Sequence, residues 1–225
     1  MTTMTDVPTL YGHPMSRAHR NLWMLRELDV PYALVPTDFL HGGNKTAEFL
    51  ALNPNGKVPV LVNGDLVLWE SLAINLYLAR RYPSSLSARS PQEHALILQW
   101  TLWAATEVEK TLFVASENLR LFAPPLRRAE EAALALAKLA RPFAVLDAQL
   151  RGRDFLLGAR FSVADINLAG VMSLVPIAGV DVSAWPDLSR WLTACLARPA
   201  ADDWTRISFT VPRPPTEAAW MQSLM

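Results

Sequence analysis

The sequence contains a single cysteine, Cys195, among its 225 residues. No disulfide can therefore form within the chain, and a reducing compartment such as the cytoplasm is expected. Cys195 falls in a late helical stretch beside Leu192 and Leu196, where a buried, unreactive thiol is expected. The first residues lack the basic start and apolar run of a secretory signal, and no apolar stretch approaches the length of a membrane span. We therefore expect a soluble cytoplasmic protein that does not bind membranes.

An excess of charge of either sign is also missing, because 21 basic residues balance 21 acidic ones. This balance argues against binding to nucleic acid or to an anionic membrane. The four histidines have no spacing typical of a metal site, and none pairs with a serine in a catalytic pattern, so no metal is expected. Apolar residues, in contrast, make up 51% of the chain, which is enough for one large domain or two small ones.

The hydrophobic pattern divides the chain into a mixed half and a helical half. The first half predicts the order βαβ, then α, then ββα, which is a compact α/β unit. Its expected strands and helices are 7–12, 16–28, 32–36, 45–50, 58–62, 65–69 and 71–81. A linker rich in proline and serine follows at residues 82–91. The second half predicts helices only, over 91–121, 124–150, 162–174 and 186–197, before an irregular tail after Phe209.

The segment Asn53-Pro54-Asn55-Gly56-Lys57-Val58-Pro59 is the most informative part of the chain. It leads into a hairpin whose turn is expected at Asn63-Gly64, where both residues tolerate φ > 0. The bond before Pro59 can be cis, which would leave the main-chain N–H and C=O of Val58 free to pair with an extended peptide. Glu70 and Ser71 then begin a helix, whose N-terminus attracts a carboxylate. Together these features predict a site for a small peptide with a free carboxylate.

The same features carry a family resemblance. The Val-Pro step, the Asn-Gly hairpin and the Glu70-Ser71 pair resemble the glutathione-binding half of the glutathione transferase family. The stretch from Gly12 to Ser16 is similar to the Gly-His-Pro-x-Ser opening of the phi-type, serine-dependent members. Ser162 and Asp165 have the Ser-x-x-Asp form of the capping box that begins a buried helix in the family's second domain. The resemblance covers roughly residues 8–200.

The resemblance implies an α/β plus all-α fold with two domains. Residues 1–83 would form a thioredoxin-like glutathione-binding domain, and residues 91–225 an all-helical domain that contributes the electrophile pocket. The implied function is detoxification by conjugating the glutathione thiolate to small hydrophobic electrophiles. Glutathione-dependent dehalogenation or isomerisation, and a non-catalytic binding or scaffold protein, stay open as alternatives. Thiol–disulfide chemistry is disfavoured, because it would need a cysteine where Ser16 stands. The composition is a separate observation: alanine is abundant and arginine far outnumbers lysine, which points to a bacterial source.

Ser16 is the candidate catalytic residue. From the sequence alone, a serine between a strand and a helix is more simply a helix N-cap. The resemblance implies instead that its hydroxyl donates a hydrogen bond to the thiolate of glutathione. A free thiol has a pKa of about 8.5, and the surroundings of a helix N-terminus lower it, so a donor at this position favours the nucleophilic form. Tyr11 is the alternative, because other branches of the family use a tyrosine from the first strand.

The resemblance also implies which residues bind glutathione. Glu70 would take the ammonium of the γ-glutamyl group and Ser71 its carboxylate, while Val58, before Pro59, would pair with the cysteinyl main chain. Lys45 and Lys57 are the candidates for the glycyl carboxylate, as point charges. Asn44 stands where phi-type members often have a histidine, so a hydrogen-bonding role is expected there, and the nearby His41 is an alternative.

The expected electrophile pocket combines Met15 and Phe39 with Trp103 and Glu107. The last two recur with Trp100 at helical spacing, a pattern that a packed core would also produce. A homodimer is expected because the family is dimeric. Several branches insert an aromatic residue, directly before the loop glycine, into the neighbouring subunit, but Asn55 occupies that position here. The contact between subunits is therefore expected to be flatter or more polar.

Overall fold

The computed structural model describes residues 7–204, and the chain divides into two compact units. The first runs to Tyr82 and also takes the last described residues, 203–204, while the second is Pro83–Asp202. The tail that the sequence predicts to be irregular, after Phe209, lies outside the described residues. No helix in the described part of the chain has both the length and the apolar character needed to cross a membrane.

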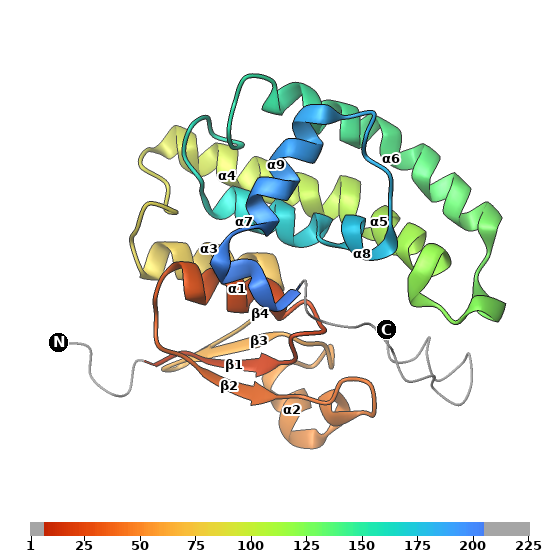
Figure 1. Ribbon diagram of the computed structural model, residues 1–225. Coiled ribbons are helices and arrows are strands. Elements are labelled where there is room, and N and C mark those ends of the chain that lie inside the picture. The colour runs from red at the N-terminus through yellow and green to blue at the C-terminus, as the bar shows by residue number, and fades with distance from the viewer. Residues whose placement is uncertain (1–6, 205–225) are drawn as a thin grey trace. The chain divides into compact units, whose positions relative to one another are not determined.

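The first unit is a four-stranded mixed sheet with helices on both faces. Its elements are β1 Thr9–Gly12, α1 His19–Glu27, β2 Ala33–Pro36, α2 Ala47–Leu52, β3 Val60–Asn63, β4 Leu66–Trp69 and α3 Ser71–Arg81. The strand order is β2-β1-β3-β4, with β1 parallel to β2 and antiparallel to β3. Figure 1 shows α1 and α3 on one face of the sheet and α2 on the other. This arrangement is the thioredoxin-like unit that the sequence predicts.

The core of the first unit lies between the sheet and the helix pair α1 and α3. Leu10 of β1 and Leu61 of β3 are fully buried, and they face each other in the register of the two strands. Leu22 and Leu25 of α1, together with Ile74 of α3, complete this buried layer. Burying a side chain of this size stabilises the fold by roughly 1.5–3 kcal/mol relative to leaving it exposed. The ends of β1 and β3, from which the site is built, therefore rest on a well-packed core.

Two local predictions in the first unit are wrong. Helix α1 begins at His19 rather than at Ser16, because the chain first makes a turn in which the Arg20 N–H bonds to the Arg17 carbonyl. The hairpin turn is Gly64-Asp65 rather than Asn63-Gly64, with only Gly64 at positive φ. Asn63 instead ends β3 as a buried residue, and its amide donates to the Tyr82 hydroxyl at 3.3 Å.

The second unit is helical, as predicted. Its α-helices are α4 Pro91–Trp103, α5 Lys110–Ser116, α6 Ala129–Leu150, α7 Val163–Met172, α8 Leu174–Ala178 and α9 Pro186–Leu196. Two wider, π-helical stretches, Ala104–Glu109 and Glu117–Leu121, follow α4 and α5, so the helix predicted over 91–121 is real but not uniform. Pro124–Leu126 forms a separate 3-10 turn, and α6 begins only at Ala129, which corrects the predicted start at Pro124.

Helix α7 is the centre of the second unit, because all of its residues are buried. The predicted capping box is present, with the Ser162 and Asp165 side chains each bonded to the other's main-chain N–H. The Asp165 carboxylate also accepts from the Leu156 N–H at 2.9 Å and from Trp191 Nε1 at 3.0 Å. Burial raises the pKa of Asp165, and these hydrogen bonds oppose that rise. Cys195 of α9 is fully buried, as predicted.

Candidate functional site

Ser16 lies in the turn between β1 and α1, three residues before the helix begins. Its hydroxyl donates to the His13 carbonyl at 2.7 Å and accepts from the Ala18 N–H at 3.2 Å. The Ser16 N–H donates to the same His13 carbonyl at 2.8 Å, so this oxygen has two donors. The His13 ring also supports the turn, because its Nδ1 accepts from the Met15 N–H at 3.1 Å. Ser16 is thus held in place by a local network, half-buried and close to the positive end of α1.

Gly12 brings the Ser16 turn and the Val-Pro step together. A Cβ built on Gly12 would lie 2.5 Å from the Cβ of Ala18 and 3.8 Å from Cα of Pro59. Real Cβ contacts are never that short, so only a glycine allows the end of β1 to approach the start of α1 this closely. The same close approach puts Pro59 beside the segment that carries Ser16. The Gly-His-Pro-x-Ser opening and the Val-Pro step therefore lie close together, where β1 ends and β3 begins.

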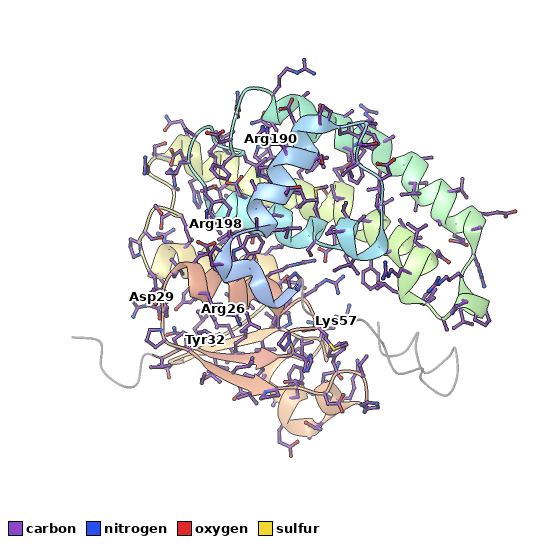
Figure 2. All side chains as sticks on the ribbon, viewed as in Figure 1. Arg26, Asp29, Tyr32, Lys57, Arg190 and Arg198 are labelled. Atoms are coloured by element: carbon purple, nitrogen blue, oxygen red, sulfur yellow. The ribbon has the colours of Figure 1, made fainter. Side chains whose placement is uncertain are left out.

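The bond between Val58 and Pro59 is cis, as the sequence suggests. Val58 precedes β3, is half-buried, and has no hydrogen-bond partner among residues 7–204. Its main-chain N–H and C=O therefore remain available to an extended ligand, in the manner of an added strand. Lys57, just before it, is labelled in Figure 2 and is exposed. Its carbonyl accepts from the Asn53 amide at 2.6 Å.

Asn44 and Lys45 lie against the loop that leads to Val58. The Asn44 amide donates to the Gly56 carbonyl at 2.7 Å, while its own oxygen is buried with no partner in the described part of the chain. A Cβ on Gly56 would lie 3.0 Å from Lys45 Nζ, and Gly56 has φ = +59°, so a glycine is needed here. The structure thus brings Asn44 and Lys45 next to the loop that carries Lys57 and Val58.

Glu70 and Ser71 begin α3, as predicted. Glu70 is exposed and has φ = +74°, a conformation that L-residues with side chains rarely adopt. Its carboxylate makes no capping bond to the helix, so it is not there to close the helix end. Ser71, the first residue of α3, is almost fully buried. Backbone strain of this kind is found preferentially at functional sites, and it distinguishes Glu70 from an ordinary first-turn residue.

Three polar residues of this region were not predicted as part of the site. Arg20 Nη1 donates to Ser71 Oγ at 3.2 Å, and Asn21 Nδ2 donates to the Ser71 carbonyl at 2.8 Å. Asn21 Nδ2 also reaches Asn75 Oδ1 at 2.8 Å, so a buried polar network links α1 to α3. Helical periodicity does not reveal this network, because polar residues on a predicted helix are expected to face water.

The remaining candidates lie in different places. Tyr11 is within β1, opposite Val60 of β3. Phe39 packs its ring 6.4 Å from that of His13, centre to centre, and so joins the Ser16 turn. His41 is exposed and bonds to the Asp38 carboxylate at 2.8 Å, and this hydrogen bond lowers the pKa of Asp38.

Trp103 and Glu107 belong to the second unit. Trp103 is half-buried and stacks edge-on against the buried Trp100 at 5.2 Å, so the stripe of aromatic residues is at least partly core, whereas Glu107 is exposed. Met15 and Phe39 therefore both contact His13 within the first unit, while Trp103 and Glu107 come from the other one.

Comparison with known proteins identifies the family. Residues 7–80 match the model of the glutathione S-transferase N-terminal domain, and residues 104–199 match that of the C-terminal domain. The chain belongs to the glutathione S-transferase family. It is 35% identical to glutathione S-transferase 3 of Zea mays over 93% of this chain and 98% of that protein. It is 36% identical to glutathione S-transferase GstB of Escherichia coli K12, over 85% and 94% of the two chains.

Solved structures of the family agree with the fold. The theta class glutathione S-transferase of Xanthomonas axonopodis pv. citri, crystallised with glutathione bound, superimposes with a TM-score of 0.84 at 30% identity, covering 91% of this chain and all of that one. Glutathione S-transferase-I bound with lactoylglutathione gives a TM-score of 0.79 at 29% identity, covering 88% and 98%. The family, the fold and the activity of a glutathione transferase that the sequence predicts are confirmed.

Proposed function

We propose that the protein conjugates the thiolate of glutathione to small hydrophobic electrophiles, with Ser16 as the hydrogen-bond donor to sulfur. One observation carries this proposal: the Ser16 turn and the unpaired main chain of Val58 lie at neighbouring strand ends, joined through Gly12. A peptide thiol paired with Val58 would therefore have its sulfur near the Ser16 hydroxyl. In the proposed domain division, residues 1–83 bind glutathione and residues 91–225 contribute to the electrophile pocket.

Ser16 favours the thiolate by supplying a hydrogen bond that only the charged sulfur accepts strongly. Its hydroxyl turns from the His13 carbonyl to the sulfur, and the His13 carbonyl keeps the Ser16 N–H as its donor. The Ser16 oxygen also keeps the Ala18 N–H, which polarises the hydroxyl toward the ligand. Each unit by which the thiol pKa falls corresponds to about 1.4 kcal/mol of preference for the thiolate.

The two ends of glutathione would be bound by opposite charges. Glu70 takes the ammonium of the γ-glutamyl group, and its lack of a capping bond leaves the carboxylate available. Ser71 binds the neighbouring α-carboxylate through its hydroxyl and the N-terminal N–H groups of α3. Lys45 and Lys57, both exposed, take the glycyl carboxylate, and the buried oxygen of Asn44 is suited to accept an amide N–H.

The electrophile would contact Met15 and Phe39, which belong to the Ser16 turn region, and Trp103 and Glu107 of the helical unit. Apolar and aromatic side chains favour a hydrophobic substrate without strong selectivity, because one methylene changes affinity by only about 1–3 kcal/mol. We further propose a cytoplasmic homodimer acting in detoxification. The exposed Asn55, which bonds to Asn53 in its own loop, supplies no aromatic anchor for that dimer.

Binding to immobilised glutathione, followed by conjugation of an aryl halide, tests the proposal. A transferase should bind the immobilised glutathione and also conjugate the aryl halide. The rate of conjugation should depend on the fraction of thiolate in the enzyme–glutathione complex. Binding without turnover on any electrophile would support a binding or scaffold protein instead. Release of halide, or isomerisation without net consumption of glutathione, would move the assignment to the corresponding glutathione-dependent reaction.

A further inference from the structure

Arg20 of α1 is a buried cation beside the N-terminus of α3. Only 3% of its surface is exposed, and its Nη1 lies 3.2 Å from the hydroxyl oxygen of Ser71, which is 4% exposed. Ser71 is the first residue of α3, where the N–H groups of a helix lack partners within the helix. Arg20 therefore contacts the side chain that stands at the end of α3 suited to bind an anion.

The chemistry of arginine also fixes the direction of the Ser71 hydroxyl. A guanidinium group only donates hydrogen bonds, so Ser71 Oγ must be the acceptor in the contact with Arg20. The hydroxyl proton consequently points away from Arg20, toward whatever acceptor lies on the other side. Asn21, the next residue of α1, fixes the main chain of Ser71 through its bond to the carbonyl. Adjacent residues of α1 thus orient both the side chain and the backbone of Ser71.

The α1 side of the network is itself anchored. Asn75, one turn along α3 from Ser71, donates to the Arg20 carbonyl at 3.2 Å and accepts from Asn21. Arg20 and Ser71 are therefore held at a fixed separation by three further hydrogen bonds between the same two helices. A donor prepared in this way loses little freedom when a ligand binds.

We propose that Arg20 is a positioning residue for the γ-glutamyl α-carboxylate of glutathione. It directs the Ser71 hydroxyl toward that carboxylate. The inference rests on the proposed function, because it names a residue that acts behind the binding site for glutathione. It predicts an effect of Arg20 that is specific to one carboxylate of the ligand.

The test compares two ligands by calorimetry: glutathione and 4-aminobutyryl-Cys-Gly, which lacks only the γ-glutamyl α-carboxylate. Arg20→Met removes both the charge and the donors at similar length, and should weaken glutathione binding roughly tenfold. The same variant should bind the analogue within about twofold of the wild type. Arg20→Lys keeps a charge and a donor, so it should recover part of the loss. In assays, KM for glutathione should rise while kcat at saturation stays unchanged.

A double-mutant cycle shows whether Arg20 acts through Ser71. In the Ser71→Ala background, Arg20→Met should cost clearly less than in the wild type, because no hydroxyl remains to be directed. Arg26→Met is the matched control, since Arg26 is a half-buried cation of the same helix near its other end (Figure 2). It removes the same charge and should leave the discrimination between the two ligands unchanged. Thermal unfolding of each variant checks that the fold is retained.

Some outcomes would overturn the inference without touching the proposed function. One such outcome is that Arg20→Met binds glutathione with wild-type affinity. Another is that Arg20→Met loses as much affinity for the analogue as for glutathione, because Arg20 would then only stabilise the fold. If Arg20→Met does not fold, Arg20→Lys must still show a larger loss for glutathione than for the analogue, and equal affinities would refute the role. If the wild type itself binds neither ligand, the proposed function is the part that fails.

Discussion

The Ser16 hydroxyl oxygen lies 2.7 Å from the main-chain oxygen of His13 and donates its proton to it. That carbonyl also receives the Ser16 N–H, so it stays hydrogen-bonded when the hydroxyl turns to another acceptor. A buried carbonyl left without a donor would cost about 1–3 kcal/mol, and this arrangement avoids that cost. The hydroxyl is therefore positioned by the turn yet free to exchange partners.

Replacing Ser16 by alanine should raise the pKa of the bound thiol and slow conjugation, with little change in glutathione affinity. Loss of one preorganised donor to an oxyanion costs about 10²–10³ in rate, and sulfur is larger and softer, so we expect roughly tenfold to a hundredfold. The measurement is the thiolate absorbance of the enzyme–glutathione complex against pH, beside rates on an aryl halide.

Tyr11→Phe is the matched control for Ser16, because it also removes one hydroxyl from the same region of the first unit. It should leave both the thiolate absorbance and the rate close to wild type. The opposite pattern, with Ser16→Ala silent and Tyr11→Phe impaired, would transfer the role to Tyr11.

Replacing Glu70 by glycine should weaken glutathione binding and yet stabilise the fold. Glu70→Ala and Glu70→Gly both delete the carboxylate, so both should weaken glutathione binding by roughly 1.5–3 kcal/mol in calorimetry. Because Glu70 has φ = +74°, glycine relieves backbone strain that alanine keeps. In denaturant unfolding, the free energy of unfolding should therefore be about 1 kcal/mol higher for the glycine variant than for the alanine variant. Wild-type affinity in either variant would contradict the ammonium contact, and a less stable glycine variant would contradict the strain.

The sequence predicted those parts of the protein that depend on local pattern. Ser71 begins a helix as predicted because the Glu70-Ser71 pair and the apolar spacing after it are local features. The start of α1 was missed because the turn at Ser16 depends on bonds to His13, which helical periodicity does not encode. The link from Arg20 to Ser71 spans 51 residues and joins two helices, so only the packed structure reveals it.

Glu93 should make stability depend on pH in the acid range. Its carboxylate accepts from the Arg89 N–H at 2.7 Å and from the Arg160 guanidinium at 2.6 Å, and these contacts lower the pKa of Glu93. An acid whose pKa is lower in the folded state stabilises the fold above its unfolded pKa and loses this effect as the pH falls. Glu93→Gln should therefore lower the free energy of unfolding by about 1 kcal/mol at neutral pH. The difference from wild type should shrink as the pH falls below the ordinary range of a glutamate, and it should vanish once Glu93 is protonated in the folded state.

The control for Glu93 is Glu131→Gln. Glu131 forms a more exposed pair with Arg128 at 3.8 Å, a geometry that contributes little in water. Denaturant unfolding at several pH values should give wild-type stability for this variant throughout. A pH-independent loss in Glu93→Gln would mean that packing, rather than charge, carries the effect.

The proposed dimer should not depend on Asn55. The Asn55 side chain is exposed and bonds to Asn53 Oδ1 at 2.9 Å within its own loop, so alanine removes a local contact rather than an anchor. Sedimentation of Asn55→Ala over a range of concentrations should give the same dimerisation constant as the wild type. A monomeric variant would show that a single residue at this position does hold the subunits together.

The hydrogen bonds of the Asp165 carboxylate determine which of the two units can fold first while the chain is being synthesised. It collects hydrogen bonds from Leu156 and Ser162, which precede it, and from Trp191, which follows it by 26 residues. Until Trp191 has left the ribosome, the buried helix α7 lacks both this donor and the packing of α9. The segment up to Tyr82, whose sheet is complete by Trp69, has no such dependence on later sequence for its strand pairing. A ribosome-arrested chain ending before residue 191 should therefore hold a formed sheet and an unfinished helical unit.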